Sequence, residues 1–141
     1  MSSFPILNIS HLIPQKYPIV MVDTLVEFSP ESLTSSLTIK ADNIFHSNNC
    51  LQEPGIIENM AQTVALHTGY DYFLKNMPAP VGYIGSIKKV EIFSLPKLNE
   101  TISTNVKILQ EFLGVTLVNI EVLSAEGKIY ATGQMKTVVA K

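Results

Sequence analysis

Glu58 is the residue of this chain best suited to acid–base chemistry. Between Pro54 and Tyr70 it is the only side chain charged near neutrality. A carboxylate in so apolar a stretch must find a partner, face a cavity or take up a proton, because burying it ionised and unpaired is very costly. If the stretch is helical, Gln62 lies one turn further on, where it can hydrogen-bond Glu58 and hold its rotamer. The simpler alternative is a carboxylate on a solvated patch that interacts with the helix dipole.

The three histidines differ in what they offer to Glu58. His46 lies in a polar stretch just before the expected helix and is the best candidate for a base; the alternative is a solvent-exposed loop histidine. His67 follows Glu58 by nine positions, which at 100° per residue places it on the opposite helix face. These two residues therefore cannot pair within one chain. His11 lies beside an expected turn, where we expect it to pack or to cap.

The remaining reactive residue types predict no metal or cofactor site. Cys50 has no Cys-His signature around it, and a small buried thiol is the commoner use of a lone cysteine. Three histidines and one cysteine without close spacing give no zinc or iron site. Gly82 and Gly85 lie inside a strand pattern, so we expect a bend or a close backbone approach there, and not a nucleotide-binding loop.

One long helix and about six strands must position these residues. Pro54 suits the first turn of a helix that runs to about Lys75 and is buried on most sides, because it has no broad charged face. Residues 41–53 are polar and aperiodic and predict a loop. The expected strands are a buried run at 19–22 that continues to 28, then 33–39, 81–93, 101–112, 115–123 and one after 125–127. The class is therefore α+β, with an antiparallel sheet curled around a central helix.

Composition limits the functional classes. The chain has 141 residues, 46% hydrophobic and 16% charged, with a net charge of −2. This predicts a single domain over residues 1–141 and no basic field for nucleic acid. No apolar run approaches the roughly 20 residues of a membrane-spanning helix. The low charge favours a homo-oligomer. Met1–Asn8 lacks the features of a signal peptide and Cys50 cannot form an internal disulfide, so we expect a cytoplasmic protein.

Two passages carry more than a pattern of elements, Leu12-Ile13-Pro14-Gln15-Lys16-Tyr17-Pro18-Ile19-Val20-Met21-Val22-Asp23 and Pro54-Gly55-Ile56-Ile57-Glu58-Asn59-Met60-Ala61-Gln62. Together they resemble the FabZ-type 3-hydroxyacyl-acyl-carrier-protein dehydratases. The first resembles the family's L-L-P-H-R-Y-P-F-L-L-V-D, and the second its Pro-Gly followed by Glu-x-x-Ala-Gln at the start of the central helix. A later stretch, Gly82 to Pro96, also looks like the family's third strand.

The resemblance implies a hotdog fold, dimeric at least, with a tunnel for an acyl-phosphopantetheine between protomers. In such a dehydratase a histidine of one subunit removes a proton from C2, and the helix carboxylic acid of the other protonates the departing hydroxyl. Glu58 matches that acid, and His46 is the candidate base. A backbone amide of Gly55 or Ile56 would polarise the thioester carbonyl. Gln62 is expected in the same substrate-binding site.

The base loop departs from the FabZ pattern. Where the family has Gly-His-Phe-Pro-Gly, this chain has Phe45-His46-Ser47-Asn48-Asn49-Cys50. In this respect the chain is similar to the dehydratase-like proteins of aryl polyene and flexirubin pigment clusters, some of which act beside a second dehydratase.

Three functions follow as hypotheses. The first is a dehydratase that makes a trans-2-enoyl thioester in fatty acid or pigment polyene synthesis, on an acyl carrier protein or coenzyme A. The second is a catalytically incomplete partner subunit of another dehydratase. The third is an acyl thioesterase, in which the helix carboxylate activates water for hydrolysis.

Overall fold

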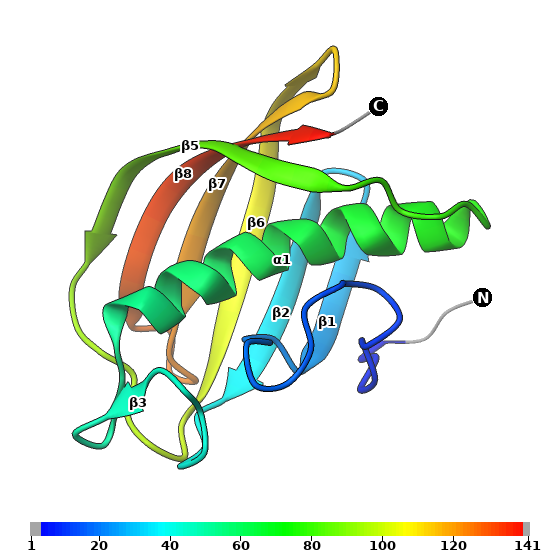
Figure 1. Ribbon diagram of the computed structural model, residues 1–141. Helices are drawn as coiled ribbons and strands as arrows, with labels where there is room; N and C mark the ends of the chain where they lie inside the picture. The colour runs from blue at the N-terminus through cyan, green and yellow to red at the C-terminus, as the bar shows by residue number, and fades with distance from the viewer. Residues whose placement is uncertain (1–3, 140–141) are drawn as a thin grey trace.

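The sheet has six antiparallel strands in a computed structural model that describes residues 4–139. It curls around the single long helix α1 (Glu53–Leu74), as Figure 1 shows. This is the α+β hotdog arrangement that the sequence predicts. The strand order is β1-β2-β6-β7-β8-β5, with bounds β1 Thr24–Ser29, β2 Ser32–Thr38, β5 Gly82–Ile92, β6 Thr101–Phe112, β7 Val115–Leu123 and β8 Ile129–Val139.

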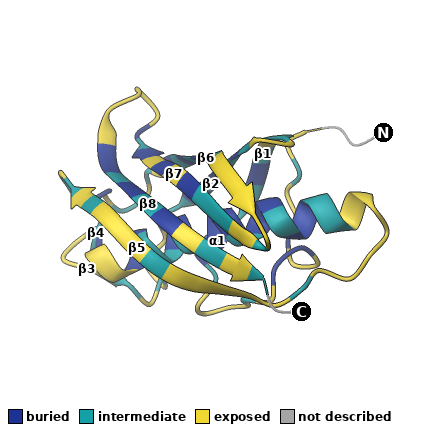
Figure 2. Cartoon of the chain, turned by 90° about the horizontal axis from the view of Figure 1, so that it is seen from above, coloured by how far each residue is buried: buried dark blue, intermediate teal, exposed yellow. Residues whose placement is uncertain are grey.

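Alternating side chains give the sheet one buried and one solvated face. Along β6, Ile102, Thr104 and Val106 are buried while their neighbours are partly or fully exposed. A strand turns successive side chains to opposite faces, so the buried set lies on the concave side toward the helix. Figure 2 shows this alternation on β7 and β8. Tight turns join these strands, with Leu113 and Gly114 at φ of 52° and 80° between β6 and β7.

The helix packs an apolar stripe into the curled sheet. Ile56, Met60 and Val64 share a core cluster with Val106 and Val118 of the sheet. Burying each such side chain contributes roughly 1.5–3 kcal/mol, so these contacts fix the helix position. The helix ends at Leu74, which agrees with the predicted end at about Lys75. No helix in residues 4–139 is long and apolar enough to cross a membrane.

The predicted strand at residues 19–22 is wrong. Strand β1 begins only at Thr24, and the apolar run before it lies against the helix. Met21 explains this, because its N–H donates to the Gln62 side chain at 2.5 Å and its carbonyl accepts from Asn59 at 2.7 Å. The N–H and the carbonyl of Met21, which a strand would pair with a neighbouring strand, are therefore both bound by helix side chains. Met21 and Val22 are buried as predicted, whereas Ile19 is exposed, and the run is not a strand.

The predicted loop at residues 41–53 contains a small hairpin. Strands β3 (His46–Ser47) and β4 (Cys50–Leu51) pair with each other and not with the main sheet. Asn48 and Asn49 connect them with φ of 52° and 62°. Asparagine tolerates this left-handed conformation better than most residues, and two such residues in a row make a hairpin turn. The hairpin lies directly before the helix and sets its starting point.

Strand β5 lies at one edge of the sheet and is mostly exposed, as Figure 2 shows. It pairs with β8 on one side, and its register shifts between Ile84 and Ser86 and again between Lys88 and Glu91. Gly85 lies at the first irregularity, which agrees with the bend expected there. Figure 1 shows β5 running beside α1.

Candidate active site

Glu58 lies in the second turn of α1 and is half-buried. Its Oε1 accepts a hydrogen bond from Gln62 Nε2 at 2.7 Å. This is the i,i+4 contact that the sequence predicts. The carboxyl group therefore has a fixed neighbour on its own helix.

Gln62 is held in one orientation by the backbone of the N-terminal segment. Its Oε1 accepts from Met21 N–H at 2.5 Å, and its Nε2 donates to the Ile19 carbonyl at 3.0 Å as well as to Glu58. An amide turned by 180° would set its nitrogen against the Met21 N–H and its oxygen against the Ile19 carbonyl, so the network excludes that orientation. The side chain is only 1% exposed. Gln62 must therefore present an N–H to Glu58.

Asn59 is a member of this network that the sequence analysis did not single out. It is fully buried, donates to the Met21 carbonyl at 2.7 Å and accepts from the Thr104 hydroxyl at 2.6 Å. Its own carbonyl accepts from Thr63, whose hydroxyl also bonds Ser35 at 2.8 Å. The argument used for Glu58 could have found it, because an amide in an apolar helix also needs partners when it is buried.

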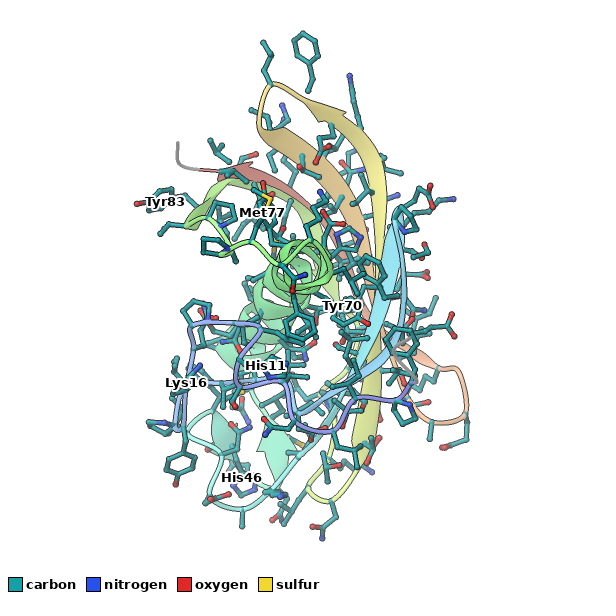
Figure 3. The ribbon with its side chains drawn as sticks, turned by 90° about the vertical axis from the view of Figure 1, so that its right-hand side faces the viewer. His11, Lys16, His46, Tyr70, Met77 and Tyr83 are labelled. Carbon is teal, nitrogen blue, oxygen red and sulfur yellow. The ribbon has the colours of Figure 1, made fainter. Side chains whose placement is uncertain are left out.

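His46 lies on the β3–β4 hairpin, where Figure 3 labels it. Its backbone is fixed by pairing with Leu51 and by a bond from its N–H to the Asn43 carbonyl at 3.0 Å. The ring is partly buried, and its Nε2 is buried without a hydrogen-bond partner among residues 4–139. The hairpin and the start of α1 are adjacent in the chain. Whether His46 is the base stays a prediction.

Gly55 allows the hairpin to touch the helix start. A Cβ at this position would lie 2.6 Å from Leu51 Cδ1 and 2.7 Å from Phe45 Cβ, so a side chain would force the hairpin away. The N–H groups of Gly55 and Ile56 both donate to the Gln52 carbonyl, at 2.9 and 3.2 Å. A thioester carbonyl would have to share one of these bonds. Their role as substrate-binding amides stays a prediction.

The other candidate residues lie apart from this group. His67 is buried, stacks on Phe28 with ring centroids 4.9 Å apart and has its Nε2 3.0 Å from the Ser29 carbonyl. This agrees with its predicted place on the helix face opposite Glu58. His11 packs edge-on against Phe73 with centroids 5.1 Å apart, as a packing residue would. Cys50 is half-buried and is a free thiol.

Two cavities of the described chain lie outside this group of residues. The larger, of about 750 Å³, lies along the C-terminal half of α1. The smaller, of about 490 Å³, lies between residues 94–101 and the β7–β8 turn. Tyr130 lines the smaller cavity, where burial and a hydrogen bond to Glu100 raise its pKa to about 12. Neither cavity is lined by Glu58 or His46, and the tunnel expected between protomers is a feature of a subunit pair.

Comparison with known proteins agrees with the resemblance seen in the sequence. A family model described as ApeP dehydratase, of the ApeP-like family, matches residues 7–141. The 3-hydroxyacyl-[acyl-carrier-protein] dehydratase FabZ of Ruminiclostridium cellulolyticum is 23% identical over 140 residues, which cover 95% of this chain and 96% of that protein.

Solved structures share the fold. The dehydratase heterocomplex ApeI:P from Xenorhabdus doucetiae superimposes with a TM-score of 0.87 at 16% identity, over 99% of this chain and 93% of that chain. A hypothetical thioesterase from Streptococcus pneumoniae with coenzyme A gives 0.67 at 7% identity, over 82% and 84%. These low identities show the fold alone. The family match covers nearly the whole sequence, and the chain therefore belongs to the ApeP-like dehydratase family.

Proposed function

We propose that this chain catalyses the loss of water from a 3-hydroxyacyl thioester to give a trans-2-enoyl thioester. Glu58 is the acid that protonates the departing hydroxyl, and His46 is the base that removes a proton from C2. The observation that carries the proposal is the Glu58–Gln62 pair at the start of the central helix, in a chain that belongs to a dehydratase family. The carbon–oxygen bond breaks, a carbon–carbon double bond forms, and the proton from C2 goes to the base.

The hydrogen bonds of Glu58 assign its two oxygens different tasks. Oε1 accepts an N–H from Gln62, whose own oxygen is occupied by Met21. A protonated carboxyl group has one O–H donor, and that proton finds no acceptor on the Gln62 side. The acidic proton therefore belongs on Oε2, the oxygen left for the substrate hydroxyl. Such positioned acid and base groups typically contribute about 10²- to 10⁴-fold each.

The same site needs groups for the base and for the thioester carbonyl. The buried and unpartnered Nε2 of His46 supports its role as a proton acceptor. The amide of Gly55 or Ile56 would be shared between Gln52 and the thioester oxygen, in the positive field of the helix N-terminus. We expect the acyl group to arrive on an acyl carrier protein or on coenzyme A. The cytoplasmic location expected from the sequence stays a prediction.

A second subunit would complete the site at the β5 edge. Ile84 and Ile87 pair with Thr137 and Met135, which places them on the concave side beside the helix, yet each is 45% exposed. An edge strand presents unpaired backbone groups, and apolar side chains beside it favour covering by another chain. The structure from Xenorhabdus doucetiae is a heterocomplex of two dehydratases. We therefore propose a second dehydratase subunit, or a second copy of this chain, at β5.

The test compares Glu58→Gln with Glu53→Gln. Glu53 is exposed in the first turn of the same helix, so its variant removes an equal charge nearby without touching the pair. We expect Glu58→Gln to lower kcat for a 3-hydroxyacyl carrier substrate by about 10²- to 10⁴-fold with an unchanged fold, and Glu53→Gln to stay near wild type. Wild-type turnover in Glu58→Gln contradicts the proposal.

The second candidate function is a partner subunit that does not turn over alone. Two observations favour this second function. The His46 loop departs from the family pattern, and one of the similar solved structures is a heterocomplex. The same assay therefore runs on the chain alone and mixed with a second dehydratase subunit. Activity of the isolated chain rules out this candidate, whereas activity only in the mixture supports it. Release of free thiol from an acyl thioester would instead identify a thioesterase.

A further inference from the structure

A chain of four hydrogen bonds connects the sheet to Glu58. The Thr104 hydroxyl, on β6, donates to Asn59 Oδ1 at 2.6 Å, and Asn59 Nδ2 donates to the Met21 carbonyl at 2.7 Å. The N–H of Met21 then donates to Gln62 Oε1 at 2.5 Å, and Gln62 Nε2 donates to Glu58 Oε1 at 2.7 Å. Figure 1 shows α1 crossing in front of β6. A strand in the middle of the sheet is therefore linked to the carboxyl group of the proposed acid.

The backbone of Met21 fixes the direction of every bond in this chain. A peptide carbonyl only accepts, so Asn59 must turn its nitrogen to Met21 and its oxygen to Thr104. The Thr104 hydroxyl must then be the donor. A peptide N–H only donates, so Gln62 must turn its oxygen to Met21 and its nitrogen to Glu58. Neither amide can turn around without losing a bond at each end.

The links of the chain are closed to solvent. Thr104 and Asn59 are fully buried, and Met21 and Gln62 are each only 1% exposed. A buried polar group that loses its partner cannot replace it with water. Loss of the Thr104 hydroxyl would leave Asn59 Oδ1 without its donor. Because the carbonyl and the N–H of Met21 belong to one residue, a shift of Asn59 then reaches Gln62.

We propose that Thr104 and Asn59 are positioning residues for Glu58. Both are fully buried, so they act on the carboxyl group through the Gln62 amide and not by touching the substrate. The inference rests on the proposed function, because an acid that protonates a departing hydroxyl needs a fixed orientation. Removal of the Thr104 hydroxyl should lower kcat and leave KM unchanged, because the acid loses its orientation while the thioester keeps its contacts.

Ser35 supplies a matched control for Thr104. The two residues pair directly across β2 and β6, both are fully buried, and each hydroxyl bonds a side chain of α1. The Ser35 hydroxyl bonds Thr63 at 2.8 Å, and the Thr63 hydroxyl donates to the backbone carbonyl of Asn59 at 2.7 Å. This branch ends on the helix backbone. Ser35→Ala therefore removes a buried hydroxyl from the same place without breaking the chain to the acid.

The first experiment measures kcat and KM for a 3-hydroxybutyryl N-acetylcysteamine thioester, with the chain in its active assembly. We expect Thr104→Val, which keeps the shape of the side chain, to lower kcat roughly 3- to 10-fold at unchanged KM. Thr104→Ser keeps the hydroxyl and loses a core methyl group, so its Tm should fall while its kcat stays near wild type. Ser35→Ala should also keep kcat. A merely structural role would instead make kcat follow stability and not the hydroxyl.

A double variant tests whether Thr104 acts through Gln62. In the Gln62→Met background the chain is already broken, so Thr104→Val should lower kcat no further. A further loss as large as that in the wild-type background would overturn the inference. A wild-type kcat in folded Thr104→Val, or equal losses in Thr104→Val and Thr104→Ser, would do the same. Thr104→Ala, which also lacks the hydroxyl, takes the place of Thr104→Val if that variant does not fold.

A readout that needs no turnover separates this inference from the proposed function. The side-chain NH₂ protons of Gln62 exchange with water, and their exchange rate, measured by NMR, reports how firmly the amide is held. We expect Thr104→Val to raise this rate roughly tenfold or more, and Thr104→Ser and Ser35→Ala to leave it near wild type. If the wild-type assembly does not turn over the thioester, the proposed function fails, and the exchange rate alone decides whether Thr104 positions the amide. Equal rates in Thr104→Val and wild type would show that it does not.

Discussion

Buried amides fix the proposed acid in place. An unpartnered polar group in a core costs about 1–3 kcal/mol, yet Asn59 and Gln62 are both buried inside the helix packing. Every bond that Gln62 makes is to a backbone group or to Glu58. The pair predicted from i,i+4 spacing is therefore part of a larger network. The other partners of Gln62 are backbone groups of residues 19 and 21, which spacing along the helix cannot reveal.

The consequence for Gln62 can be measured with Gln62→Met. Methionine keeps the length of the side chain but removes the amide, so Glu58 loses its donor and Met21 its acceptor. We expect kcat to fall about 10- to 100-fold with little change in KM, because the carboxyl group loses its orientation and the thioester keeps its contacts. Gln110→Met, at an exposed position of β6, is the control. A wild-type kcat in folded Gln62→Met would show that Gln62 does not position Glu58.

The helix and the last strands follow from local sequence patterns, and the N-terminal segment does not. The bounds of β6 and β7 match the predicted residues 101–112 and 115–123, because alternation and turn residues act locally. An apolar run such as 19–22 has no alternation, so its pattern fits a buried strand or any other buried segment. Its true state depends on Asn59 and Gln62, almost forty residues away. The pairing of His46 with Leu51, by contrast, has a local signal in Asn48-Asn49, which form the hairpin turn.

Substitution of Gly69 tests how the N-terminal segment packs on the helix. A Cβ at Gly69 would lie 1.8 Å from the carbonyl oxygen of Leu12, so the two backbones touch. Glycine to alanine inside a helix normally stabilises by up to about 1 kcal/mol. Here we expect the opposite sign, a loss of roughly 1–3 kcal/mol in the free energy of unfolding.

Denaturant unfolding measures the change in Gly69→Ala, and Gly82→Ala is the control. At Gly82 an added Cβ would meet only the Val138 carbonyl oxygen, at 3.9 Å. Stabilisation of Gly69→Ala would show that the segment does not pack as described.

At the scale of the whole molecule, the sheet offers one long exposed edge for assembly. Tyr83 and Val138 pair across β5 and β8, and Val115 and Phe112 continue this row of exposed apolar side chains across the convex face. Composition predicts that so weakly charged a chain associates, but it cannot locate the interface. The strand order places β1 and β5 outermost, and the bridge between Ile6 and Leu25 occupies part of the β1 edge, so β5 is the edge left open.

Lysines on β5 should block that association, as charged residues do on natural edge strands. We expect the double variant Tyr83→Lys/Ile87→Lys to shift the complex with a second dehydratase subunit, or with a second copy, to separate chains in sedimentation. Leu109→Lys/Leu113→Lys replaces two exposed apolar groups that lie near the β6–β7 turn, outside this row, and should keep the complex. Equal dissociation of both variants would place the interface elsewhere.

The segment before β1 adds no strand to the main sheet, yet it supplies both backbone groups that orient Gln62. A chain shortened to start at Asp23 would retain the sequence of every strand and of the whole helix. It would lose the two anchors that turn the Gln62 amide toward Glu58. The orientation of the Gln62 amide toward the proposed acid thus depends on a segment that forms no strand of the main sheet.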